Sequence, residues 1–138
     1  MSALEFLDTN VLVYAYDPHE PRRQQIARGL VRRALAGEIV ASSQVLGEFA
    51  TTLLHKLTPA TNPDDLIGLL DSLGPIKLVP LDGDVVVRAL RAHAQYGLHF
   101  YDGLIVAAAE RGGCQKIWSE DLNAGQRYFG IMVENPFV

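Results

Sequence analysis

The chain has 138 residues, 49% of them hydrophobic, so it is the size of one ordinary domain and can bury a single core. With 12 basic and 16 acidic residues its net charge is −4, the wrong sign for a protein that holds nucleic acid by bulk electrostatics alone. A lone cysteine, Cys114, excludes an internal disulfide, and Glu5 and Asp8 interrupt the apolar run near the start, so we expect a cytoplasmic protein without a signal peptide or membrane span.

Short apolar strands alternate with helices, and no repeat or linker divides residues 1–138 into more than one domain. The first half predicts a strand at 3–8, a helix at 21–37, a strand at 38–42, and a helix at 44–57 that Ser43 caps. The second half predicts a helix at 62–74, a strand at 76–81, helices at 82–97 and 101–113, and strands at 115–119 and 130–137. This alternation predicts an α/β fold, with a central, mostly parallel sheet of about five strands flanked by helices on both faces.

Four acidic residues fall where ligands bind in such sheets, beyond the carboxyl ends of the strands. Asp8 ends the first strand, and Glu48 lies one turn into the helix after the second strand. Asp102 opens the Ala-rich helix, and Asp121 follows the strand at 115–119. Each acid also has an ordinary alternative role. Asp8 and Asp102 could cap helices, Asp121 could be a turn residue, and Glu48 could lie on a solvated helix face. Together they predict one site, because all four converge if the chain folds as its pattern indicates.

A cluster of carboxylates has a definite chemistry. Carboxylates within a few ångströms repel one another by about a few kcal/mol per pair unless a cation joins them. Oxygen ligands without His or Cys suit Mg²⁺ or Mn²⁺ better than Zn²⁺, and such ions serve phosphoryl chemistry through a metal-activated water. Asn10, Thr9 and Ser119 can support the site by orienting carboxylates or a bound water, and local backbone bonding is their alternative role.

Four segments resemble the PIN-domain family, and within it the VapC toxins of toxin–antitoxin pairs. They are FLDTNVLVYAYD at 6–17, SSQVLGEFATTL at 42–53, HFYDGLIVAAAERGGCQKIWSEDLNAGQ at 99–126, and the closing NPF. The resemblance implies a Mg²⁺- or Mn²⁺-dependent endoribonuclease, the toxin of a type II toxin–antitoxin system, that cleaves RNA phosphodiesters with a metal-activated water. It also implies a homodimer and a cognate VapB-type antitoxin that blocks the acidic site.

Carried over position by position, the resemblance assigns catalysis and metal binding to Asp8, Glu48, Asp102 and Asp121, with Asn10 and Ser119 in support. Gly103 stands where the family more often has Ala after the third acid. That difference should cost a little helix stability and leave the chemistry unchanged.

Basic residues gather in the helix predicted at 21–37, which carries five of the 12 in the chain. On a helical projection Arg22, Arg28, Arg32 and Arg33 share a face opposite Ala27, Leu30, Val31 and Ala34. Beside an acidic site, that face is a candidate track for an RNA backbone, and an ordinary solvated face is the alternative.

Other acidic α/β proteins match less well. Phosphatases of the haloacid dehalogenase type use D-x-D after the first strand, where this chain has Asn10 as the third residue. Response-regulator receivers pair acids at the end of the first strand, whereas the adjacent pair Asp64 and Asp65 opens a helix. Two alternatives remain open, a PIN nuclease that processes RNA without being a toxin and a PIN domain that binds RNA or protein without cleaving.

Overall fold

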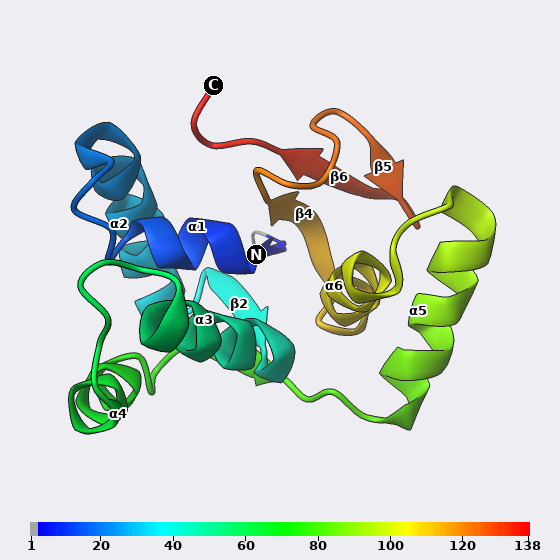
Figure 1. The fold of residues 1–138 in the computed structure, drawn as a ribbon. Coiled ribbons are helices and arrows are strands. Elements are labelled where there is room, and N and C mark those ends of the chain that lie inside the picture. The colour runs from blue at the N-terminus through cyan, green and yellow to red at the C-terminus, as the bar shows by residue number, and fades with distance from the viewer. Residues whose placement is uncertain (1–2) are drawn as a thin grey trace.

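A six-stranded sheet forms the centre of the computed structural model, which describes residues 3–138 (Figure 1). The strands run in the order β3-β2-β1-β4-β6-β5. Their bounds are β1 Leu4–Leu7, β2 Ile39–Ser42, β3 Leu78–Val79, β4 Cys114–Trp118, β5 Arg127–Tyr128 and β6 Ile131–Glu134. Four pairings are parallel and the β5–β6 pairing is antiparallel, which confirms the predicted α/β class and mostly parallel sheet.

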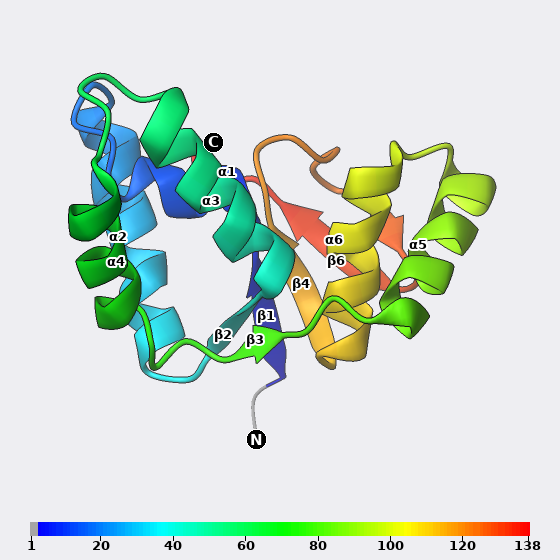
Figure 2. The ribbon, with the colours of Figure 1, turned by 60° about the horizontal axis from the view of Figure 1, so that its bottom comes forward.

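Helices lie on both sides of this sheet, as the two ribbon views show (Figure 2). On one side are α1 (Thr9–Tyr14), α2 (Pro21–Leu35), α3 (Ser43–His55) and α4 (Pro63–Ser72). On the other are α5 (Gly83–Tyr96) and α6 (Phe100–Arg111). Within residues 3–138, no helix has the length and apolar character needed to cross a membrane.

The second half of the central strand β1 is buried, and the position of this strand in the sheet determines where the following residue, Asp8, lies. Phe6 and Leu7 are fully buried, and β1 pairs in parallel with β2 on one side and β4 on the other. Parallel neighbours bring the carboxyl ends of all three strands to the same edge of the sheet. The side chains that follow these strands therefore lie close together, which is the arrangement the site requires.

Some local predictions were wrong. Ser42 caps α3 in place of Ser43, since its Oγ accepts a hydrogen bond from the Val45 N–H at 3.2 Å. The Ser43 Oγ accepts instead from the Leu81 N–H at 3.0 Å. Strand β3 covers 78–79 rather than 76–81, and it ends at Val79 because Pro80 has no N–H with which to continue the ladder. The short helix α1 and the β5–β6 hairpin were not predicted as separate elements.

Helix α6 is buried along most of its length and packs closely against α5. Seven consecutive residues of α6, from Gly103 to Ala109, are buried. A Cβ placed on Gly103 would lie 2.7 Å from the backbone oxygen of Ala89 in α5. Gly103 is therefore needed for the close approach of the two helices, a packing requirement that the predicted small cost in helix stability does not include.

Gly103→Ala should destabilise the protein, although alanine is the better helix former. We expect a loss of about 1–3 kcal/mol in the free energy of unfolding, because the rigid backbone of α5 must move to relieve the overlap. Denaturant unfolding measures this loss. The matched control is Gly68→Ala in α4, where nothing lies within 4 Å of the added Cβ and a gain of up to about 1 kcal/mol is expected. Equal gains at both positions would contradict the packing argument.

Candidate functional site

Asp8 lies at the carboxyl end of β1 and caps the helix α1. Its Oδ1 accepts a hydrogen bond from the Thr9 N–H at 2.7 Å, and its Oδ2 accepts one from the Ser119 hydroxyl, also at 2.7 Å. The residue is 6% exposed. The alternative role as a cap is thus real, but each carboxylate oxygen keeps a further lone pair. Asp8 can cap α1 and still bind a cation.

The protonation of Asp8 reflects its surroundings. Burial raises the pKa of this carboxyl to about 6 from an ordinary value of 3.8. The hydrogen bonds from Ser119 and Thr9 act in the opposite direction, and the charges of Asp121 and Glu48 raise the pKa further. The predicted ligands Asp121 and Glu48 therefore lie within electrostatic reach of Asp8.

Glu48 approaches the site from the exposed side of α3. Its Oε1 accepts a hydrogen bond from the Gln44 Nε2 at 2.6 Å, and its Oε2 lies 3.5 Å from the Thr9 hydroxyl, at the limit of a hydrogen bond. Gln44 Nε2 also donates to the backbone oxygen of Tyr101 at 3.2 Å, which ties α3 to the start of α6. Sequence reasoning missed Gln44, although its position four residues before Glu48 is the spacing at which helical side chains meet.

Asp102 and Asp121 complete the acidic set. Burial raises the pKa of Asp102, His99 lowers it, and the charge of Asp121 raises it. The cap of α6 is His99, whose Nδ1 accepts from the Tyr101 N–H at 3.2 Å, so the alternative role of Asp102 as the cap was wrong. Asp121 is exposed, and its N–H donates to the Ser119 Oγ at 3.2 Å.

Ser119 is the centre of the hydrogen bonding beneath these acids. It is fully buried, donates to Asp8, and accepts from the N–H groups of Asp121 and Leu122, the second at 3.1 Å. Its hydroxyl thereby links the end of β1 to the loop that follows β4. Ser119 thus lies one hydrogen bond from Asp8, and its supporting role in the site stays a prediction.

Two of the four acids, Glu48 and Asp121, line a hollow at this edge of the sheet. A pocket of about 390 Å³ is lined by Thr9, Asn10, Val13, Tyr14, Asp17, Glu48, Thr52, Lys56, Glu120 and Asp121. Within residues 3–138, no three His, Cys, Asp or Glu side chains are close enough together to hold a metal ion directly. The donors present are carboxylate oxygens, which suit Mg²⁺, and Mg²⁺ usually keeps several waters and takes only one or two carboxylates. The donor set therefore fits a partly hydrated ion.

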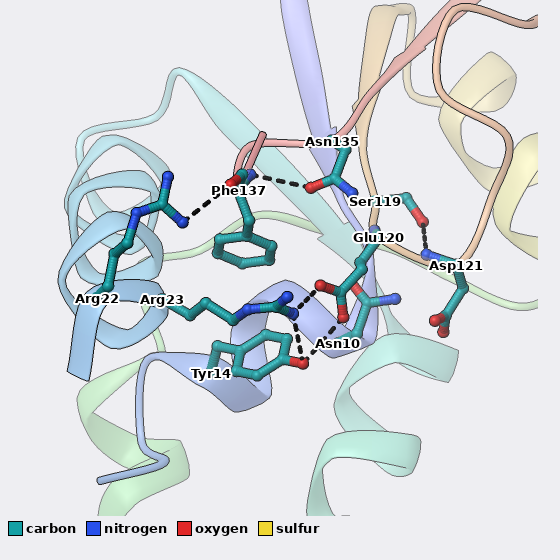
Figure 3. Close-up of polar contacts among 9 residues, drawn as sticks. All are labelled: Asn10, Tyr14, Arg22, Arg23, Ser119, Glu120, Asp121, Asn135 and Phe137. Atoms are coloured by element: carbon teal, nitrogen blue, oxygen red, sulfur yellow. Dashed lines mark hydrogen bonds and ion pairs between the residues drawn. The ribbon is translucent and has the colours of Figure 1, made fainter. Parts of the chain in front are cut away.

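A second group of residues holds the loop after β4 in place (Figure 3). Glu120 pairs with Arg23 of α2 and accepts a hydrogen bond from the Tyr14 hydroxyl at 2.9 Å. The Arg23 guanidinium lies 5.2 Å from the Tyr14 ring and 5.3 Å from the Phe137 ring, and the Glu120 N–H donates to Asn10 Oδ1 at 3.2 Å. These contacts anchor the loop that carries Ser119 and Asp121. Sequence reasoning assigned a role only to Asn10 among these polar residues.

The proposed arginine track has other contacts. The predicted buried face of α2 is confirmed, since its buried residues are Ala27, Leu30, Val31 and Ala34. Arg22 donates to the Phe137 backbone oxygen at 2.9 Å, and Arg28 donates to the Ala15 backbone oxygen at 3.1 Å. Arg33 pairs with Glu5 and Glu38, toward the opposite end of β1 from Asp8. Arg32 is exposed, and an RNA track along this face stays a prediction.

The model of the PIN domain family matches residues 6–129 of this chain. A comparison with curated proteins finds no match. Similar solved structures include FitAcB from Neisseria gonorrhoeae, with 17% identity, a TM-score of 0.68, and 97% of this chain and 99% of that chain covered. A toxin–antitoxin complex from Klebsiella pneumoniae has 16% identity, a TM-score of 0.67 and coverages of 96% and 97%. The sarcin–ricin-loop-cleaving toxin VapC20 of Mycobacterium tuberculosis has 18% identity, a TM-score of 0.63 and coverages of 85% and 91%.

Replacing Asp8 by Asn should change how stability depends on pH. Because the pKa of Asp8 is about 6 in the folded protein and ordinarily 3.8, the folded protein binds more protons than the unfolded chain between those values. The free energy of unfolding of the metal-free protein should therefore fall as pH rises through that window, by about 3 kcal/mol from this residue. Asp8→Asn removes this contribution.

Urea unfolding in EDTA at several pH values measures the effect. The difference in stability between Asp8→Asn and the wild type should move in favour of the variant as pH rises from about 4 to about 7.5. Asp8→Asn also turns an amide group toward the Ser119 hydroxyl. Any loss of stability from that contact is the same at every pH, so it cancels when the differences at several pH values are compared. Asp71→Asn, at an exposed position of α4, is the control for removing a surface carboxylate. A difference for Asp8→Asn that stays constant with pH would contradict the buried charge.

Proposed function

This chain belongs to the PIN-domain family, and from that premise we propose that it is a divalent-metal-dependent endoribonuclease and the toxin of a type II toxin–antitoxin system. The observation that carries the proposal is the mutual influence of four carboxylates at one edge of the sheet. Asp121 and Glu48 raise the pKa of Asp8, and Asp121 raises that of Asp102. A folded protein gains little from such repulsion unless a cation offsets it.

Asp8, Glu48, Asp102 and Asp121 would hold Mg²⁺ or Mn²⁺ in this proposal. Carboxylate oxygens are ligands that Mg²⁺ accepts, and this ion usually keeps several waters when one or two carboxylates bind it. When bound, such an ion supplies a hydroxide nucleophile near neutral pH and neutralises charge that develops on a phosphodiester. The other contributions to catalysis come from the protein's own residues.

The protein's own contribution is positioning. The Thr9 N–H and the Ser119 hydroxyl fix both oxygens of Asp8, so this carboxylate does not need to reorient during the reaction. Asp102 lies in the first turn of α6, where free N–H groups and the helix dipole favour a negatively charged side chain and a substrate phosphate. Asn10 and the Arg23–Glu120 pair hold the loop that presents Asp121.

Partners and location are part of the same proposal. The similar structures include a toxin–antitoxin complex from Klebsiella pneumoniae and a toxin that cleaves the sarcin–ricin loop. By analogy with them, this chain would act on RNA in the cytoplasm and be inhibited by a cognate VapB-type antitoxin. Assembly as a homodimer belongs to the same analogy.

The purified protein should cleave single-stranded RNA in Mn²⁺ or Mg²⁺ and stop when EDTA is added. Asp8→Asn should lower the cleavage rate by about 100-fold or more, because the loss of a ligand should exceed the effect of losing a supporting residue. Gel assays with end-labelled RNA measure the rate, and Asp71→Asn is the control that should cleave normally. Full activity in Asp8→Asn would refute the site, and RNA binding without cleavage by the wild type would favour a non-cleaving PIN domain.

The role as a toxin has a separate test in cells. Induced expression should arrest growth in a manner that requires Asp8, and co-expression of a short open reading frame encoded beside this one should restore growth. Growth curves of wild type and Asp8→Asn, with and without that partner, measure both effects. Harmless expression of an active wild-type nuclease would refute the toxin role and favour a PIN nuclease of RNA processing.

A further inference from the structure

A second hollow adjoins the acidic pocket. It has a volume of about 340 Å³, lies between α3 and the start of α6, and is lined by Gln44, Gly47, Glu48, Thr51, Thr52, Lys56 and Tyr101. Glu48, Thr52 and Lys56 also line the acidic pocket, so the two hollows share part of one wall. A chain molecule with one unit at the acids can therefore place its next unit beside Tyr101.

Tyr101 presents an aromatic ring to solvent at this place. It is 59% exposed, and within residues 3–138 it is the one aromatic residue among the exposed large hydrophobic side chains. Its ring stacks on the His99 ring, with centroids 5.7 Å apart and planes inclined by 21°, and meets the Phe100 ring edge-on at 5.6 Å. These neighbours hold the Tyr101 ring in place without covering it.

The backbone of Tyr101 is fixed as well. Its carbonyl oxygen accepts from Gln44 Nε2 and its N–H donates to His99 Nδ1, each at 3.2 Å. Gln44 also donates to Glu48, and the next residue in the chain is Asp102, so the ring is tied directly to two of the four acids. A rigid exposed ring loses little conformational entropy when a flat ligand stacks on it.

Lys56 supplies the complementary charge. It is exposed at the end of α3, and among the described residues it is the one cationic side chain in the walls of either hollow. The remaining charged side chains of both walls are acidic and would repel a polyanion. Lys56 therefore marks the place where a phosphate can approach with a favourable charge.

We propose that the hollow beside Tyr101 is a subsite for an unpaired nucleobase of single-stranded RNA, next to the phosphate that is cut. The base stacks on Tyr101, and the adjoining backbone phosphate faces Lys56. This inference rests on the proposed ribonuclease function. It predicts a preference for unpaired RNA, because a base in a duplex is not free to stack on a protein ring.

The test uses short single-stranded oligoribonucleotides that carry 2-aminopurine, a base whose fluorescence falls when it stacks. Binding is measured in EDTA in the Asp8→Asn background, so that the RNA is not cut. Replacing Tyr101 by Leu should weaken binding about tenfold and abolish part of the quenching, whereas Tyr101→Phe should bind within about twofold of the parent. Leu90→Ala, at another exposed apolar side chain on α5, is the control for general surface effects.

Two further binding measurements distinguish base stacking from other causes of weaker RNA binding. An RNA with an abasic nucleotide at the sensitive position should bind equally weakly to the parent protein and to the Tyr101→Leu variant, since the base and the ring act only together. Lys56→Gln should weaken RNA binding. It should also reduce the slope of log affinity against log salt concentration by the amount expected for about one phosphate contact.

Unchanged RNA binding and quenching in Tyr101→Leu would overturn the subsite, as would equal binding of duplex and single-stranded RNA. If Tyr101→Leu binds RNA normally but is no longer neutralised by the antitoxin, the ring serves a protein partner and the inference is wrong. Failure of the wild type to cleave any RNA would instead refute the proposed function, so the two failures are distinguishable.

Discussion

The burial of the Asp8 carboxylate at the end of β1 is the constraint on which the site depends. A charged group that is 6% exposed must be paired or hydrogen-bonded, and Asp8 receives the Thr9 N–H and the Ser119 hydroxyl. These two bonds do not compensate the charge fully, because the pKa of Asp8 remains raised to about 6. The fold therefore keeps an incompletely compensated negative charge at the edge of its sheet, where a cation can bind.

Much of the surrounding structure maintains that arrangement. Parallel pairing of β1 with β4 brings Ser119 next to Asp8, and Ser119 in turn orients the loop that carries Asp121. The ion pair of Arg23 with Glu120 packs against the Tyr14 and Phe137 rings and anchors the same loop to α2 and to the C-terminal segment. The closing NPF sequence thus has a physical role, since the buried Phe137 ring covers Arg23.

The sequence predicted the frame of the site because that frame follows from the order of elements along the chain. Alternating strands and helices imply a parallel sheet, and such a sheet gathers the residues that follow its strands, among them Asp8 and Asp121. The pairing of Arg23 with Glu120 could not be predicted, because these residues are 97 positions apart and belong to different elements. The β5–β6 turn could not be predicted either. Hairpin turns are usually marked by Asn-Gly or Asp-Gly, whereas here Phe129 adopts the positive φ, at 49°. The requirement for Gly103 depends on the distance to α5, which local helix propensity does not contain.

We propose that Asp8 and its acidic neighbours bind a divalent cation. Calorimetric titration of Mn²⁺ into the metal-free protein at about pH 7.5, where Asp8 is ionised, tests it without any assumption about the substrate. We expect saturable binding of Mn²⁺ to the wild type and a loss of most of that binding in Asp8→Asn. Equal binding of Mn²⁺ by the two proteins, or none by the wild type, would contradict it.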